Sequence, residues 1–395
     1  MAKNLTRRQK QKLNKLANKH WRIVIAVVVL AAMFLTLAYF MGWLDKWLKD
    51  SPTLSTAGGY STTVTKLKDM EINFLDVGQG DCIIIELPDG KNMIIDSGKY
   101  TSCQDVISEF TTTNNIDTFD YLLLTHQDDD HAGNMNWVID NYKVKYIFRP
   151  NNHSEHSLSG ELPSDFNTKT EGAYVSTTKT YAEFMVSAYN EKCTVEVFNK
   201  DSDFSNEIIY NGTTLNYTFN FWTPTADRNE IVYSKKNDYS PIMTLEYCGK
   251  KIMFTGDAEL DNIGEYVETY GSINNIDVLK VGHHGSENAT TQAFISAIDP
   301  EYAVIQCGID NSYGHPHSET LEILKDHDGG VTVFRNDTNG NITLTVSQNG
   351  EINELAFELE HDDCSNNYVP GIKPSEQSLN VNYMKYYDNR QALIA

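Results

Sequence analysis

The alternation of apolar and polar positions predicts two series of strands and helices built on the same plan. The first series predicts strands at 71–76, 82–87, 91–95, 121–124 and 144–148, and helices at 103–112 and 134–142. The second series predicts a hairpin over 242–254, helix 260–270, strand 276–281, helix 290–298 and strand 302–306. Two such series indicate two sheets packed face to face between helices, which is an α/β sandwich.

The segments outside these two series are more polar. Residues 151–233 are irregular apart from a helix expected near 177–189, and we interpret them as an insertion over one face, with a separate small domain as the alternative. Residues 45–68 are rich in Ser, Thr and Gly, which is typical of a stalk. The chain turns polar again near its end, so we interpret 69–360 as the folded domain and 361–395 as a C-terminal tail.

The N-terminal part of the chain predicts a membrane anchor. Residues 23–44 contain no charged side chain, and at about 1.5 Å per residue they are long enough to cross a bilayer. Tryptophans flank this run, and all the basic side chains of the region precede it, within residues 1–22. The positive-inside rule therefore places 1–22 in the cytoplasm and 45–395 outside the cell. A cleaved signal peptide and the opposite orientation are the alternatives.

Composition narrows the class of protein further. The 395 residues include 32 Lys and Arg against 54 Asp and Glu, which gives a net charge of −22. The part of the chain after the predicted anchor has a clear excess of acidic over basic side chains. The ordinary apolar content excludes a disordered chain or a polytopic membrane protein. Six cysteines without a CxxC pair exclude a small disulfide scaffold and a cysteine zinc finger. Cys82, Cys193, Cys248 and Cys307 lie in or beside apolar runs, which predicts buried free thiols.

The strongest chemical signal follows the apolar strand expected at 121–124. His126, Asp128, Asp129, Asp130 and His131 place two imidazoles and three carboxylates within six residues. These groups would repel one another in an empty loop, and a divalent cation would remove that penalty, because both are ligands for zinc and manganese. The end of a buried strand is also where α/β sheets place their sites. The alternative interpretation is a solvated acidic loop.

Two more strands end in ligand-type side chains. Asp257 follows the second strand of the hairpin, and His283 and His284 follow the strand expected at 276–281. With His315 and His317, three motifs hold six of the eleven histidines. This clustering predicts that the three motifs meet at one edge of the sandwich.

The motifs resemble the metallo-β-lactamase superfamily and, within it, the C-terminal hydrolase domain of ComEC-type competence proteins. The matching segments occur in the family's order over roughly residues 70–345: Phe74–Asp81, Ile95–Gly98, His126–His131, Thr255–Asp257, His283–Ser286 and Tyr313–His317. The resemblance implies an αββα metallo-β-lactamase sandwich with a metal centre at the strand edge, preceded here by the one predicted transmembrane helix.

Residue by residue, the resemblance implies a centre with two divalent ions, zinc or manganese. The implied metal ligands are His126 and Asp128 for the first ion, Asp130 and His131 for the second, Asp257 between both, and His283 completing the second, with His284 as the less favoured candidate. Supporting positions behind the ligands are implied for Asp81, Asp96 and Asn237. Because this chain has no clear equivalent of the superfamily's isolated third-motif histidine, we expect the first ion to be held weakly.

The same resemblance implies roles in catalysis. Asp130 would take part in the chemistry, and His315 and His317 would lie beside the substrate as phosphate clamp or general acid. The alternative for His315 and His317 is a loop that caps the following helix.

For function, the resemblance implies hydrolysis of DNA or another phosphodiester through a metal-activated water. With the anchor predicted at 23–44, the first hypothesis is an anchored extracellular nuclease. The alternatives are a phosphodiesterase on envelope polymers or lipid headgroups, and a non-catalytic surface binding protein. The acidic balance counts against DNA, since nucleic-acid affinity depends on phosphate neutralisation by Lys and Arg. A local basic patch for DNA would consist of Arg228, Lys235, Lys236 and Arg335.

Overall fold

The computed structural model describes residues 60–150, 152–154, 174–176, 178–197, 204–210, 213–222, 233, 235–271, 275–327 and 330–357. The predicted cytoplasmic segment 1–22, the transmembrane helix 23–44 and the C-terminal tail 361–395 lie outside these described residues. Within the described part of the chain, no helix has the length and apolar character needed to cross a membrane.

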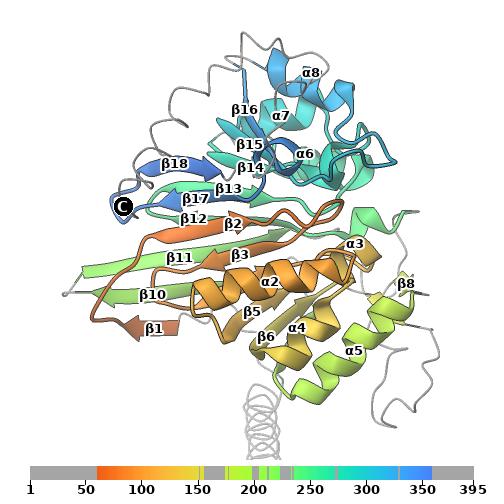
Figure 1. Cartoon of the computed structure of the whole chain (residues 1–395). Helices are drawn as coiled ribbons and strands as arrows, with labels where there is room; N and C mark the ends of the chain where they lie inside the picture. Colours follow the sequence, from red (N-terminus) through yellow and green to blue (C-terminus); the bar gives the residue numbers. More distant parts are fainter. Residues whose placement is uncertain are drawn as a thin grey trace, which may run out of the picture. The chain divides into compact units, whose positions relative to one another are not determined.

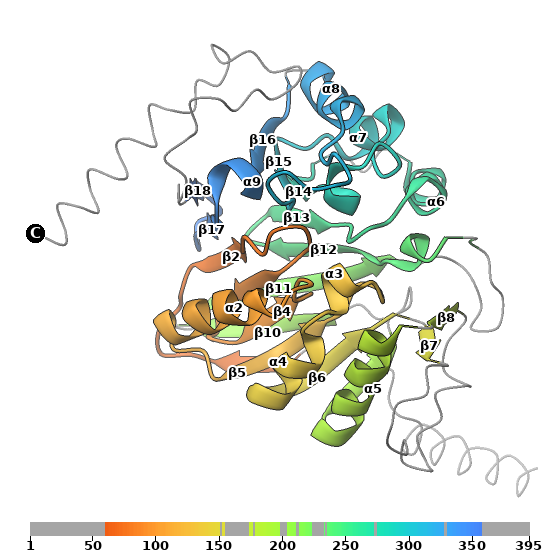
Figure 2. The same cartoon turned by 45° about the vertical axis from the view of Figure 1, so that its right-hand side comes forward.

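Two eight-stranded sheets face each other and carry helices on their outer sides (Figures 1 and 2). The first sheet has the order β1 (Tyr60–Thr63), β10 (Phe204–Tyr210), β11 (Thr213–Trp222), β12 (Ile242–Tyr247), β13 (Lys250–Phe254), β14 (Val278–Lys280), β15 (Tyr302–Ile305) and β16 (Thr332–Arg335). The second has the order β18 (Ile352–Phe357), β17 (Ile342–Val346), β2 (Met70–Phe74), β3 (Ile83–Glu86), β4 (Asn92–Ile95), β5 (Thr118–Leu123), β6 (Lys143–Arg149) and β9 (Thr194–Val197). A small separate sheet pairs β7 (Asn152–Ser154) with β8 (Tyr174–Ser176).

Helices cover both outer faces of the sandwich (Figure 1). The second sheet is covered by α2 (Ser102–Thr113), α4 (Met135–Asn141) and α5 (Lys179–Glu191). The first sheet is covered by α6 (Leu260–Tyr270), α7 (Gln292–Ile298) and α8 (Ser318–Asp326). Short helical turns complete the described chain: α3 (Asp129–Ala132), η1 (Asn237–Tyr239), η2 (Gly282–Gly285) and α9 (Asn336–Asn339). The layering confirms the predicted α/β sandwich.

Three apolar clusters hold these four layers together, and strand β3 shows why. Its Ile83 and Ile85 point into the cluster between the sheets, whereas Ile84 points into the cluster beneath α2, α4 and α5. Successive side chains of a strand point to opposite faces, so a strand covered on both sides needs an unbroken apolar run. Between the sheets, the rings of Phe74 and Phe254 stack with their centroids 6.3 Å apart, which joins one sheet to the other.

The parallel parts of the two sheets determine where the site lies. Strands β4, β5, β6 and β9 pair in parallel in one sheet, and β13, β14, β15 and β16 do so in the other. Carboxyl ends of parallel strands meet at one edge of a sheet, where α/β folds form crevices. The predicted ligand segments follow β4, β5, β13 and β14, so the topology brings them to this edge.

The structure differs from the sequence prediction in two stretches. Within residues 151–233, expected to be an insertion over one face, α5 confirms the helix predicted near 177–189 and packs on one sheet. The rest differs from the prediction, since β9 extends that sheet and β10 and β11 extend the other. In β11, the buried Tyr217, Phe219 and Phe221 alternate with polar residues, a period-two pattern that the polar composition conceals. Residues 60–63, expected in the stalk, form β1 at a sheet edge.

The cysteines of the described chain are unpaired, as predicted. Cys82 and Cys307 are fully buried, whereas Cys193 and Cys248 are only partly buried. Burial raises the pKa of the Cys82 thiol well above its ordinary value, so this thiol acts as part of the apolar core.

Candidate metal centre

The loop after β5 presents two buried imidazoles side by side. His126 and His131 are both fully buried, and their ring centroids are 4.1 Å apart. One turn of helix, α3, carries His131 inward. Its Nδ1 lies 2.7 Å from Oδ2 of Asp96, which follows β4. Because Nδ1 is engaged there, the ring directs Nε2 into the space between the sheets, the arrangement in which a carboxylate fixes a histidine for metal binding.

Asp96 is itself held in place by the loop that it supports. Thr125 donates to Asp96 through its backbone N–H at 2.8 Å and through its hydroxyl at 2.6 Å. Asp96 has a left-handed φ of 56° and is fully buried. A buried non-glycine residue in this strained conformation marks a position specified by its surroundings. The structure therefore places Asp96 behind a candidate ligand, as the resemblance implies.

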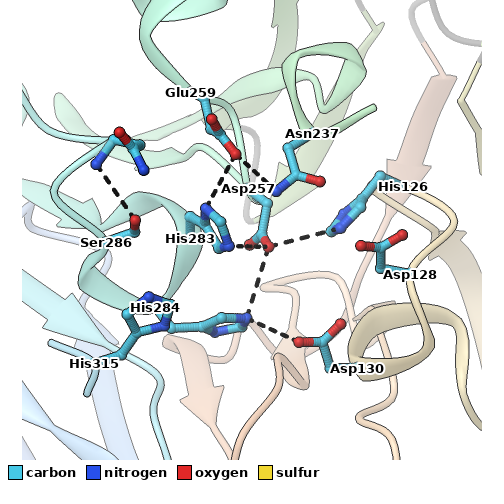
Figure 3. Close-up of polar contacts among 12 residues, drawn as sticks. His126, Asp128, Asp130, Asn237, Asp257, Glu259, His283, His284, Ser286 and His315 are labelled. Carbon is cyan, nitrogen blue, oxygen red and sulfur yellow. Dashed lines mark hydrogen bonds and ion pairs between the residues drawn. The ribbon is translucent and has the colours of Figure 1, made fainter. Parts of the chain in front are cut away.

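Asp257 lies at the middle of the candidate centre (Figure 3). Its carboxylate is 3.2 Å from His131 Nε2, and its Oδ2 is 3.7 Å from Nε2 of His126 and of His284 and 3.8 Å from Nε2 of His283. Burial alone would raise the pKa of Asp257, but these imidazoles hold it well below its ordinary value. One carboxylate facing four ring nitrogens suits the bridging position that the resemblance implies.

The turn before Asp257 allows this close approach. Gly256 has a φ of +50°, and a Cβ atom added there would lie 3.0 Å from Cβ of Thr125 and 3.1 Å from Cβ of Ser240. Glycine is therefore required by both conformation and space. The turn brings the end of β13 against the loop after β5, so the two sheets share the centre.

The two adjacent histidines after β14 point in different directions. Both have left-handed backbones, with φ of 47° at His283 and 53° at His284. His284 is buried, its Nδ1 lies 2.9 Å from the Gln306 carbonyl, and its Nε2 is 3.4 Å from Oδ2 of Asp130. His283 is partly exposed, with Nδ1 3.4 Å from Glu259. The geometry thus favours His284 over His283 as the partner of Asp130, the reverse of the order that the resemblance implies.

Asp81 contacts the centre from behind. Its carboxylate lies 3.3 Å from Nδ1 of His284 and 3.8 Å from Nδ1 of His131, and it forms an ion pair with the buried Lys280. One atom each of Asp81, His131, Asp257 and His284 lie within 4.8 Å of one another. The Nε2 atoms of both rings nevertheless face Asp257 and not Asp81. Asp81 is therefore placed as a support for the imidazoles.

The donor set fits a divalent cation. Nε2 of His126, His131 and His284 and Oδ1 of Asp257 are buried and have no hydrogen-bond partner. Buried polar atoms are almost always paired, so three ring nitrogens without a hydrogen bond around one such carboxylate oxygen fit a site for a cation. Nitrogen and carboxylate donors suit zinc or manganese.

The pKa values of His131 and His284 are also consistent with a metal-binding site. Burial opposes charge on His284, but Asp257, Asp130 and Asp81 raise its pKa to about 10. Burial also opposes charge on His131, whose pKa the nearby carboxylates raise well above its ordinary value. Without a cation, these carboxylates hold protons on both rings. A bound metal ion would replace those protons.

The other half of the candidate centre is arranged differently. Burial lowers the pKa of His126, which keeps its ring neutral. Asp128 accepts a hydrogen bond from the ammonium of Lys236. Asn237 does not reach a ligand directly; its side chain donates to Glu259 at 3.1 Å, and Glu259 in turn faces His283.

The loop of residues 311–317 brings only one of its two histidines to the centre. The ring centroid of His315 is 5.3 Å from that of His283 and 6.1 Å from that of His284, and the ring is largely buried. Burial and the neighbouring rings lower the pKa of His315 to about 4. His317 instead accepts from the backbone N–H of Glu287 at 3.0 Å, and its other ring nitrogen lies 3.2 Å from the Tyr313 carbonyl. These contacts join His317 to neighbouring loop backbone and not to the centre. His317 is the N-cap residue of α8, but its side chain makes no capping hydrogen bond to that helix.

The sequence patterns did not predict three side chains at the centre as site residues. These are Lys280, Glu259 and Lys236, of which Lys236 was expected only in a basic patch. Lys280 is a single lysine in an otherwise apolar strand, a signal that a buried charge needs a partner. Glu259 and Lys236 are ordinary charged residues in loops, and nothing in their local sequence marks them. Their contacts with His283 and Asp128 depend on the tertiary fold.

Comparisons with known proteins agree with this geometry. Residues 75–188 match the model of the metallo-beta-lactamase superfamily. The chain is 27% identical over 313 residues to ComE operon protein 3 of Bacillus subtilis, a match that covers 73% of this chain and 36% of that protein. It is 23% identical over 329 residues to competence protein ComA of Neisseria gonorrhoeae, covering 83% of this chain and 39% of that protein. The chain thus spans less than two fifths of the length of these curated relatives.

Among solved structures, the metallo-beta-lactamase fold protein YhfI from Bacillus subtilis matches 68% of this chain and 96% of its own, with a TM-score of 0.39 and 10% identity. The matched family model includes the His126–His131 motif. The match to the family model, together with the sandwich and the strand-edge centre, assigns residues 75–188 to a metallo-β-lactamase superfamily domain, and the chain is similar in sequence to ComE operon protein 3 and competence protein ComA.

Proposed function

We propose that this chain is a metal-dependent phosphodiester hydrolase that acts on DNA at the outer surface of the membrane. The observation that carries the proposal is the set of buried, unpartnered donors that converge on Asp257. A divalent cation held there would activate a water and neutralise charge on a phosphodiester. The predicted helix at 23–44 would anchor the enzyme, with the domain outside the cell.

The chain's own residues supply position and orientation. Asp96 and the Gln306 carbonyl engage Nδ1 of His131 and His284, so both rings present Nε2 to the centre. Asp257 lies between the donors that each sheet contributes (Figure 3). His315, neutral at physiological pH because its pKa is about 4, lies next to the partly exposed His283. It would contact the phosphate or the leaving oxygen through a hydrogen bond.

An exposed aromatic ring supports a nucleic-acid substrate. Tyr313 is 58% exposed and stacks on His315 with a centroid separation of 5.6 Å. Exposed aromatic side chains beside a phosphate site are platforms on which bases stack, at about 1–3 kcal/mol per base. The similarity to proteins named for competence is consistent with DNA as the substrate.

The pairing of the basic residues favours a second candidate, a phosphodiesterase on envelope polymers or lipid headgroups. Arg228 lies outside the described residues. Each other member of the predicted basic patch is paired with an acid: Lys235 with Glu259, Lys236 with Asp128 and Arg335 with Asp337. Paired cations neutralise fewer phosphates, and a small or lipid-borne phosphodiester needs fewer basic contacts than DNA.

Cleavage assays distinguish the candidates. The full-length protein would be incubated with end-labelled single- and double-stranded DNA, and separately with bis-p-nitrophenyl phosphate, in zinc or manganese. Asp257→Asn serves as the inactive control, and Asp140→Asn, at an exposed position on α4, serves as the matched control. DNA cleavage by the wild type and Asp140→Asn alone supports the nuclease.

Other outcomes change the assignment. Hydrolysis of bis-p-nitrophenyl phosphate without DNA cleavage would favour the envelope phosphodiesterase. Bound metal without either activity would favour a surface binding protein. Tyr313→Ala provides a further test, since it should raise KM for DNA severalfold and leave KM for bis-p-nitrophenyl phosphate unchanged; equal effects on both would argue against base stacking.

A further inference from the structure

The candidate ligands fall into two groups according to their partners. The donors of His126, His131, His284 and Asp257 that face the centre are buried and unpartnered. Asp128 differs, because the Lys236 ammonium donates a hydrogen bond to its Oδ1. The carboxylate implied as a ligand of the first ion is therefore already in contact with a cation that belongs to the chain.

Lys236 is held in this place by a fixed segment. It directly precedes η1, and Asp238 of η1 caps the start of α6 by accepting from the backbone N–H of Glu259 at 3.0 Å and of Asn262 at 3.2 Å. The side chain of Asn262 donates back to the Asp238 carbonyl at 2.9 Å. Since α6 begins shortly after Asp257, one segment positions both the lysine and the bridging carboxylate. Lys236 is thus anchored beside the centre.

The positions of the first and the second metal ion also differ in the side chains available to bind the ion. The second position has Asp130, His131 and His284 together with Asp257, and all except Asp130 are fully buried. Among the described residues, the first is offered His126 and Asp128 together with Asp257. The partly exposed His283 also directs Nε2 to the same Asp257 oxygen, at 3.8 Å, and its Nδ1 faces Glu259. A divalent ion beside Asp128 would have to displace the ammonium or lie next to it, and like charges at contact repel each other.

We propose that the ammonium of Lys236 takes the place of the first metal ion beside Asp128, so that the chain binds one divalent ion tightly and a second only weakly. The tight ion is held by Asp130, His131, His284 and Asp257. This inference rests on the metal centre of the proposed function and adds the number of ions and the residue that sets it. Its test counts ions, so it fails or succeeds separately from any assay of DNA cleavage.

Metal stoichiometry tests the inference. The full-length protein would be dialysed against zinc buffered at low free concentration by a chelator, and bound zinc per chain measured by mass spectrometry. The wild type should retain one ion, and Lys236→Met should retain two, because Asp128 is then free to bind metal and the affinity for the second ion rises at least tenfold. Asp128→Asn should still retain one.

A matched variant controls for loss of a surface charge. Lys145 pairs with Asp120 at 2.5 Å, with its side chain about as exposed as that of Lys236, and this pair lies on β6 and β5. Lys145→Met should therefore retain one ion. Manganese adds a spectroscopic readout: the wild type should show the signal of an isolated ion, and Lys236→Met should add that of two coupled neighbouring ions.

Four results would overturn the inference. Two tightly held ions in the wild type would show that Lys236 does not exclude the first. One ion in Lys236→Met, with a melting temperature equal to that of the wild type, would show that the lysine does not control the second ion. Loss of the tight ion in Asp128→Asn would show that Asp128 helps to hold this ion, and that the ligands assigned to it above are wrong. Absence of zinc from every variant would overturn the metal centre itself and this inference with it.

Discussion

Asp96 offers the sharpest test of how the centre is organised. The residue is fully buried and its carboxylate is shared by three donors: the Thr125 N–H at 2.8 Å, the Thr125 hydroxyl at 2.6 Å and Nδ1 of His131 at 2.7 Å. In Asp96→Asn, one carboxylate oxygen becomes an NH₂ group. That group must face either Thr125 or His131, so at least one buried donor loses its acceptor.

The size of the effect follows from these contacts. A buried donor left without an acceptor costs about 1–3 kcal/mol. A carboxylate that orients a metal-binding histidine contributes about 10- to 100-fold in metal affinity, equivalent to about 1.4–2.8 kcal/mol. We therefore expect Asp96→Asn to weaken zinc binding by about 10- to 100-fold and to destabilise the metal-free protein by about 1–3 kcal/mol.

Competition with a chromophoric chelator measures the zinc Kd, and urea unfolding of the chelator-treated protein measures the stability. Asp140→Asn, which removes an exposed carboxylate of α4, is the control and should behave as the wild type. A zinc Kd for Asp96→Asn within about threefold of the wild-type value would refute the argument that this carboxylate holds His131 for the metal.

Substitutions at three other places in the fold test separate parts of the structure. Asp257→Ala should lower zinc content and abolish turnover, because it removes the carboxylate that faces the four imidazoles; full zinc occupancy with retained turnover, by mass spectrometry and kinetics, would contradict the bridging assignment. Asp81→Asn should destabilise the protein by about 3–5 kcal/mol in urea unfolding, because it leaves the Lys280 ammonium buried and unpaired. Adding Lys280→Met should recover most of this lost stability. No recovery would show that the broken ion pair is not the cause. His315→Ala should reduce turnover with zinc retained, whereas His317→Ala should mainly lower the melting temperature; loss of zinc in either variant would make this a ligand loop.

The sequence predicted best those parts of the fold where both faces of a strand are covered. Ile83, Ile84 and Ile85 form an unbroken apolar run because each side of β3 is buried. The ligand-type residues were equally visible, since each group directly follows such a strand. His126 and Asp257 could therefore be assigned to one edge from the sequence alone.

The remaining features depend on contacts that no local pattern records. Strand β11 was missed because its outward residues, such as Asn220, are polar and mask the buried alternation of Phe219 and Phe221. The choice between His283 and His284 depends on backbone angles in a strained turn, and sequence spacing treats the two as equivalent. The contact between Lys236 and Asp128 joins segments that are distant in sequence.

The origin of the donors in two sheets has a consequence for the distant core. His126 and His131 follow a strand of one sheet, whereas Asp257 and His284 follow strands of the other. The spacing between the sheets, to which the stacked Phe74 and Phe254 contribute, is therefore also a spacing between ligands. Metal–ligand distances are expected to fall within about 0.2 Å of their standard values, so metal binding depends closely on this spacing. We therefore expect that core mutations can alter metal affinity even where they leave the unfolding curve unchanged. Metal affinity would then be a more sensitive measure of how the two sheets pack than stability is.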